Sequence, residues 1–227
     1  MLFFKAIIGV LAQVLFFGLL LLLPARTWFW EDANIFLLCY LVMVIPAAIY
    51  QCLYYPKSIE ARLITSSSNQ PKEDKLALLI VILGVMGFFV FIPIDVFHLM
   101  IFLPPSFAIK FFGLGIAALG FAIIFTAQAQ NAYAEPIVEI QEDRGQVLID
   151  TGLYAHVRHP MYSGGLIFFS GVALWLGSIF TATFGAVLLM LVFLPRIFIE
   201  EKTLKNGLKG YEDYMKRVRS RIIPKLF

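Results

Sequence analysis

Two short stretches in the C-terminal half concentrate the residues whose types and spacing could carry chemistry. Residues 146–162 read QVLIDTGLYAHVRHPMY, and residues 196–224 begin RIFIEEKTL. In the first stretch, Arg158 and His159 precede Pro160, which suits the first turn of a helix. Because a helix N-terminus carries positive partial charge, an Arg and a His there favour a ligand that bears a carboxylate or another anion. The same residues are also typical of a cluster that contacts lipid headgroups at the membrane surface.

The second stretch places acidic residues beside an apolar segment. Arg196 and Glu200 are four residues apart and therefore share one helical face, and Glu201 follows directly. Carboxylates near lipid are costly unless they are paired or face a polar cavity. The pattern therefore predicts either an i,i+4 ion pair at the end of the helix or a ligand-binding site. Only Gly177 and Ser178 separate the preceding apolar segments, which predicts an antiparallel helical hairpin. That hairpin would bring both stretches into one pocket, open to the cytoplasm and roofed by apolar spans.

The composition shows what kind of elements must position these residues. Hydrophobic residues make up 60% of the 227-residue chain and charged residues 15%, against roughly 45–50% and about 25% in soluble proteins. We predict an all-α, polytopic membrane bundle, because only helices satisfy their own backbone in lipid without closing a barrel. The apolar segments indicate about six spans, five being possible because the last two are short: 2–23, 34–55, 76–98, 107–127, 161–176 and 179–195.

The basic residues predict the orientation of the spans. They gather in the second loop, the fourth loop and the tail after Glu201, which alone holds eight, whereas the first loop has only Arg26. With six spans these segments fall on one side together with Lys5, so both termini are predicted to be cytoplasmic. We divide the chain into an N-terminal four-span membrane region, 1–127, and a C-terminal region, 128–227, that holds both stretches, the hairpin and the tail.

Three further features lie outside the two stretches. Asp95, His98 and Lys110 lie near span ends, and we expect them to snorkel to the outer interface, although charge inside a membrane also suggests function. Cys39 and Cys52 read as buried apolar residues, and no Cys/His cluster predicts a metal site. Small residues are predicted to allow close helix contacts; they are Gly113, Ala117, Gly120, Ala173 and Gly177.

The tail is predicted to form an amphipathic helix on the cytoplasmic leaflet. Its apolar and aromatic residues recur at helical spacing between many basic ones. The residues that define this face are Tyr211, Tyr214, Val218 and Ile222. Ordinary positive-inside topology explains the charge equally well.

The two stretches together resemble the isoprenylcysteine carboxyl methyltransferase family and the wider group of membrane phospholipid and small-molecule methyltransferases. The resemblance rests on GLYAHVRHPMY, the hairpin, RxxxEExxL and YEDYxxxVxxR in that order, over about the last 90 residues. The first four spans carry no matching motif, and substrate choice is expected to vary there.

The resemblance implies an S-adenosyl-L-methionine site facing the cytoplasm. Arg196 would face the methyl acceptor, and Arg196 and Glu200 would be the catalytic pair. The family often has His where this chain has Gln146, which can hydrogen-bond but cannot transfer a proton. The implied cofactor-binding residues are Gln146, Val147, Leu148, Ile149, Tyr154, His159, Pro160, Met161, Tyr162, Glu200 and Glu201.

We therefore predict a membrane methyltransferase whose lipophilic acceptor enters from the bilayer, with membrane lipids and no nucleic acid as partners. A carboxylate acceptor, such as a prenylcysteine, arrives charged and needs no general base, and an Arg can orient it bidentately. The alternatives within the group are a small thiol or a phospholipid headgroup amine. Those of another class are an NADPH-dependent membrane reductase, and a transporter or other non-enzymatic membrane protein. The sequence leaves the oligomeric state open.

Overall fold

The computed structural model describes residues 1–62 and 70–226, and every regular element in these ranges is helical. Long apolar runs fold this way because each helix satisfies its own backbone hydrogen bonds. The α-helices are α1 (Leu2–Ala25), α2 (Glu31–Tyr54), α3 (Pro56–Arg62), α4 (Lys72–Ile94), α5 (Phe107–Gln130), α6 (Pro160–Trp175), α7 (Ala186–Gly207) and α8 (Tyr211–Arg217). Short π-helical turns, η1 (Asp95–Leu99) and η4 (Thr181–Gly185), and 3-10 turns, η2 (Glu142–Arg144) and η3 (Gly152–Ala155), complete the described elements.

The predicted class, a polytopic helical bundle, is confirmed. Within the described ranges, five helical segments are long and apolar enough to cross a bilayer: Leu2–Ala25, Glu31–Tyr54, Lys72–Leu99, Phe107–Gln130 and Thr181–Gly207. The remaining long helix, α6, has 16 residues, which gives about 24 Å at 1.5 Å per residue. The last segment continues past Pro195, the predicted end of the apolar run, so Arg196, Glu200 and Glu201 all lie on α7.

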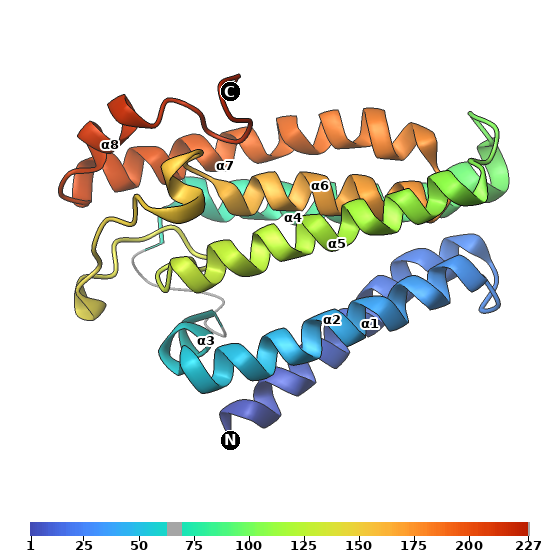
Figure 1. Cartoon of the computed structure of the whole chain (residues 1–227), viewed down its shortest axis with the longest axis horizontal. Helices are drawn as coiled ribbons and strands as arrows, with labels where there is room; N and C mark the ends of the chain where they lie inside the picture. The colour runs from blue at the N-terminus through green and yellow to red at the C-terminus, as the bar shows by residue number, and fades with distance from the viewer. Residues whose placement is uncertain (63–69, 227) are drawn as a thin grey trace.

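The helices run back and forth, so that the connections alternate between the two ends of the bundle (Figure 1). The N-terminus, α3, the segment between α5 and α6, and α8 lie at one end, and the turns α1–α2, α4–α5 and α6–α7 lie at the other. The basic segments therefore gather at one end, as the charge count predicts. Which side of a membrane this end faces stays a prediction.

Glycines bring α5 and α6 into close contact. A Cβ on Gly164 would lie 2.9 Å from the carbonyl oxygen of Gly120, and one on Gly113 would lie 2.9 Å from that of Gly171. Ala117 is buried between these contacts. The predicted small-residue packing is confirmed at Gly113, Ala117 and Gly120, with Gly164 and Gly171 as partners on α6.

The α6–α7 hairpin turns as predicted and buries a carboxylate that was not expected inside. Gly177 has a φ of 99°, a region that favours glycine. The hydroxyl of Ser178 donates to Asp95 Oδ2 at 2.5 Å, and the backbone N–H of Ile101 donates to Oδ1 at 3.1 Å. The prediction that Asp95 snorkels is wrong, because these donors satisfy the carboxylate where it is 3% exposed.

The other two ionisable residues at this end are not buried: Lys110 is half-buried and His98 is exposed. Lys110 Nζ lies 2.6 Å from Asp32 Oδ2, and His98 Nε2 lies 3.3 Å from the carbonyl oxygen of Pro24 at an exposed position. Neither contact involves Arg158, His159 or Glu201, the residues of the two sequence stretches.

The tail helix is shorter than predicted. Helix α8 ends at Arg217, and the chain then continues without regular structure through Val218 to Ile222. The predicted apolar face points into the protein, because Tyr211 and Tyr214 are 3% and 1% exposed and pack with Val218. Ile222 belongs to a separate buried cluster beside α7.

Candidate active site

The start of α6 is held by the C-terminal segment. His159 is the N-cap of α6 and Pro160 opens the helix, as predicted. The backbone N–H of Arg158 donates to the carbonyl of Ser220 at 3.0 Å, and that of His159 donates to the carbonyl of Arg221 at 2.8 Å. Helix α8 ends early for this reason: the following backbone pairs with the approach to α6 instead of with itself.

Glu201 joins the two sequence stretches. Its Oε1 accepts from Arg158 Nε at 2.7 Å and lies 3.3 Å from His159 Nε2, while its Oε2 accepts from Arg221 Nε at 3.0 Å. Arg158, His159 and Glu201 are buried. The hairpin thus brings the stretches together as predicted, and the tail supplies a further cation.

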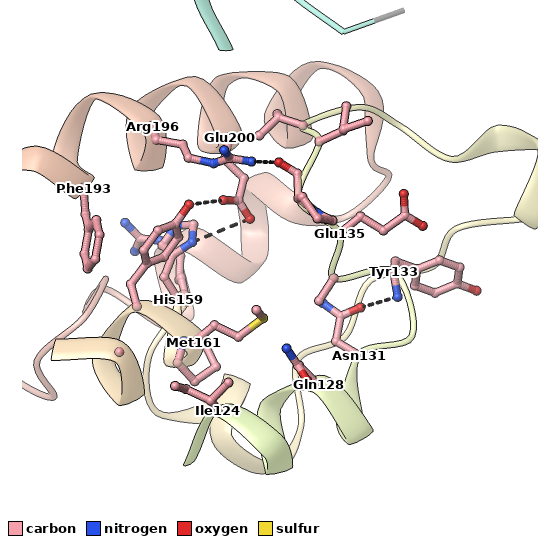
Figure 2. A pocket seen from close by; sticks show the side chains of 18 of the residues that line it. Ile124, Gln128, Asn131, Tyr133, Glu135, His159, Met161, Phe193, Arg196 and Glu200 are labelled. Atoms are coloured by element: carbon pink, nitrogen blue, oxygen red, sulfur yellow. Dashed lines mark hydrogen bonds and ion pairs between the residues drawn. The ribbon is translucent and has the colours of Figure 1, made fainter. Parts of the chain in front are cut away.

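A cavity of about 440 Å³ lies beside this cluster, bounded by the end of α5, the segment after it, and α4, α6 and α7 (Figure 2). Small-molecule sites have volumes of roughly 300–1,000 Å³, so this cavity can hold a nucleoside-sized ligand. The predicted site residues that line it are Gln146, Tyr154, His159, Pro160, Met161, Tyr162, Arg196 and Glu200.

Four predicted cofactor residues lie outside the cavity wall. Val147 is 57% exposed, and Leu148 packs against the cluster of Tyr211 and Tyr214. Ile149 and Glu201 are also absent from the wall, and Glu201 is engaged by the three partners given above. Their roles toward a cofactor stay predictions.

Glu200 directs its carboxylate to the cavity side of α7 (Figure 2). His159 Nδ1 lies 3.8 Å from Glu200 Oε1, and the Tyr162 hydroxyl donates to Oε2 at 3.4 Å. Because the side chain of Glu200 is 31% exposed and these contacts are long, its oxygens keep capacity for another hydrogen-bond donor.

Arg196 is anchored by partners that the sequence analysis did not consider. Its guanidinium donates to the carbonyl of Pro136 and lies 3.8 Å from Asp74 Oδ1. Asp74 is fully buried, and its Oδ2 accepts from Gln70 Nε2 at 2.6 Å and from the backbone N–H of Val138 at 3.2 Å. Arg196 is therefore fixed in orientation, and α4 contributes to the site through Asp74.

The segment after α5 supplies cavity residues that sequence reasoning missed. Glu135 and Glu139 line the cavity, and Glu139 Oε2 is buried with no hydrogen-bond partner among the described residues. Burial raises the pKa of Glu135, against the attraction of Arg144. The available signal was their place in the polar segment between two apolar runs, where Glu135 and Glu139 are four residues apart. Further lining residues are Arg62, Gln128, Asn131 and Tyr133.

The tail also contacts the cavity wall. The Tyr214 hydroxyl donates to the carbonyl of Tyr154 at 2.8 Å. Burial raises the pKa of Tyr154 to about 12, so this cavity residue stays neutral at physiological pH. Among the described residues, no group of three or more His, Cys, Asp or Glu side chains is placed to hold a metal ion.

Comparison with known proteins identifies the class of protein to which this chain is similar. Residues 108–209, which cover α5 from its second residue and all of α6 and α7, match the phospholipid methyltransferase family. The chain is 31% identical over 163 residues to protein-S-isoprenylcysteine O-methyltransferase B of Arabidopsis thaliana, covering 70% of this chain and 78% of that protein. It therefore belongs to the protein-S-isoprenylcysteine O-methyltransferase family, and the resemblance in the sequence is confirmed.

A second relative matches over a shorter region. The chain is 32% identical over 127 residues to the protein-S-isoprenylcysteine O-methyltransferase of Schizosaccharomyces pombe, covering 52% of this chain. The match spans about half the length of that relative, 54%.

Proposed function

We propose that this chain is an integral membrane enzyme that transfers a methyl group from S-adenosyl-L-methionine to the carboxylate of a lipophilic, prenylcysteine-like acceptor. The observation that carries the proposal is the 440 Å³ cavity, whose wall holds Glu200 and Arg196 on one helix at one end of an apolar bundle. Membership of the methyltransferase family supports the reaction type.

The charges of the cavity wall fit this cofactor. S-adenosyl-L-methionine carries a sulfonium, an ammonium and a carboxylate, and the wall supplies Glu139 and Glu200 for the cations. The buried Oε2 of Glu139 has no hydrogen-bond partner within the described part of the chain, and a donor from the cofactor would relieve the cost of leaving it unpaired. When bound, the cofactor supplies a methyl group already activated by its positive sulfur.

The residues of the chain then have to align the reactants and exclude water. Tyr154, Met161 and Tyr162 line the cavity and would enclose the cofactor, while Glu200 would contact its ribose or its amino group. A carboxylate acceptor is already charged, so none of these groups has to remove a proton. Arg196, held by Asp74 and the Pro136 carbonyl, would orient that carboxylate for in-line attack.

We also propose that the cavity faces the cytoplasm and that the acceptor enters from the bilayer. The cavity lies at the end of the bundle where the basic segments gather. Positive segments favour the cytoplasmic side of a membrane. The apolar outer faces of the helices favour an acceptor that is itself dissolved in lipid.

The matched phospholipid methyltransferase family favours a second candidate, a phospholipid headgroup amine. Such an ammonium must lose a proton before it can attack, whereas Arg196 suits a carboxylate.

A labelled-methyl screen with the purified full-length chain tests the proposal. The acceptors are a prenylcysteine acid, its methyl ester, a fatty acid, a small thiol and phosphatidylethanolamine. Base-labile label on the prenylcysteine acid alone is the expected result. Label on phosphatidylethanolamine would replace the first candidate by the second, and no label on any acceptor would contradict both.

A further inference from the structure

A buried pair of opposite charges joins α4 to α7 behind the cavity wall. Asp74 Oδ1 lies 3.8 Å from Arg196 Nη2, and the two side chains are 0% and 6% exposed. Arg196 lines the cavity, whereas Asp74 does not. Asp74 therefore acts on a ligand in the cavity through Arg196, without touching the ligand itself.

The two carboxylate oxygens of Asp74 have different partners. Gln70 Nε2 and the backbone N–H of Val138 both donate to Oδ2, at 2.6 Å and 3.2 Å. Oδ1 is buried and accepts no hydrogen bond from the described residues. Hydrogen bonds to Oδ2 thus hold the carboxylate in place, and Oδ1 faces the charge of Arg196.

The same pair holds a short segment of the cavity wall. Arg196 Nη2 donates to the carbonyl of Pro136, two residues before the N–H that Asp74 accepts. The guanidinium is therefore held from two sides in the absence of a ligand. Because the buried carboxylate offsets most of its charge, Arg196 offers directed N–H donors with little net attraction for an anion.

The chemistry of the proposed reaction makes this charge balance matter. Methyl transfer turns an anionic acid into a neutral ester, so the negative charge of the acceptor disappears as the bond forms. An uncompensated cation beside the carboxylate would stabilise the reactant more than the transition state and would slow the transfer. A balanced cation orients the carboxylate and avoids this cost.

We propose that Asp74 is a positioning residue that balances the charge of Arg196, so that the guanidinium orients the acceptor carboxylate without binding it too tightly. This rests on the proposed function and extends it to a residue of α4, outside the two sequence stretches. Asp74 thereby sets how strongly the protein prefers the acid over its ester product.

The substitution Asp74→Asn tests the charge with little change of shape. The carbonyl oxygen of the amide can take the place of Oδ2 and accept from both donors, while the amide nitrogen replaces Oδ1. The measurement is equilibrium binding of N-acetyl-S-farnesylcysteine and of its methyl ester to the full-length protein in nanodiscs, without cofactor.

Acid binding is expected to tighten about tenfold in Asp74→Asn, because an opposing charge near the carboxylate is removed. Ester binding is expected to stay unchanged. Asp143→Asn, which removes an exposed carboxylate outside the cavity wall, is the control and should bind both ligands as the wild type does. A purely structural role would weaken the binding of both ligands, so unchanged or weaker acid binding would overturn the proposal.

Steady-state kinetics with saturating S-adenosyl-L-methionine give a second readout. The KM for the acid and kcat are both expected to fall in Asp74→Asn, because the reactant is stabilised more than the transition state. A lower kcat with an unchanged or higher KM would contradict the charge balance. If Asp74→Asn does not fold, Asp74→Ser keeps an oxygen acceptor, removes the same charge and carries the same expectations.

The binding measurement separates this proposal from the proposed function. Wild-type protein that binds the acid but transfers no methyl group would contradict the proposed function, while the acid and ester affinities would still decide the role of Asp74. Wild-type protein that transfers the methyl group, with equal acid affinity in Asp74→Asn, would overturn the role of Asp74 alone. Failure of the wild type to bind the acid would overturn both.

Discussion

Arg158 Nε lies 2.7 Å from Glu201 Oε1, and the side chains of both residues are almost entirely buried. This contact joins the approach to α6 to the C-terminal part of α7 across 43 residues of sequence. His159 and Arg221 contact the same carboxylate. Glu201 thus fixes the relative positions of the helix start, the tail and the cavity-lining His159.

We expect Glu201→Gln to destabilise the protein by about 3–5 kcal/mol, because removing one partner leaves buried cations uncompensated. The measurement is thermal unfolding of the purified protein in detergent. Glu212→Gln is the control, because Glu212 and its ion-pair partner Lys205 both have largely exposed side chains. Equal unfolding temperatures for Glu201→Gln and the control would contradict a structural role for the buried carboxylate.

We expect Glu200→Ala to abolish the calorimetric signal for S-adenosyl-L-methionine binding, because the carboxylate faces the cavity and keeps hydrogen-bond capacity. Glu142→Ala, an exposed acidic residue outside the cavity wall, is expected to bind as the wild type does. Intact binding in Glu200→Ala would remove this residue from the cofactor site.

We expect Arg196→Ala to lower acceptor turnover about a hundredfold, as misplacement of a reactant does, with little change in cofactor affinity. The loss also leaves Asp74 without its ion-pair partner. The double variant Arg196→Ala/Asp74→Asn should therefore recover thermal stability but not turnover. Recovery of both would show that Arg196 acts only on the fold.

We expect Gly171→Ala to destabilise the α5–α6 contact by about 1–3 kcal/mol, the usual cost of overpacking. Its Cβ would lie 2.6 Å from the carbonyl oxygen of Gly113. Gly115→Ala is the control, since a Cβ there meets nothing within 4 Å. An unfolding temperature for Gly171→Ala equal to or higher than that of the control would argue against close packing at this site.

The sequence by itself determined the membrane class, the hairpin and the meeting of the two stretches. Each of these depends on local or one-dimensional information: apolar length, the two-residue turn at Gly177 and Ser178, and helical spacing on α7. The hairpin geometry then left little freedom, so Arg158 and His159 had to lie near Glu200 and Glu201.

Only the tertiary structure decided which groups complete the site. Asp74 meets Arg196, Arg221 meets Glu201, and Arg62 lines the cavity, each from an element distant in sequence. The burial of Asp95 and the early end of α8 likewise depend on hydrogen-bond partners elsewhere in the chain. No local pattern encodes such pairings, because a buried charge is satisfied by whichever donor or acceptor the packing of distant helices brings within reach.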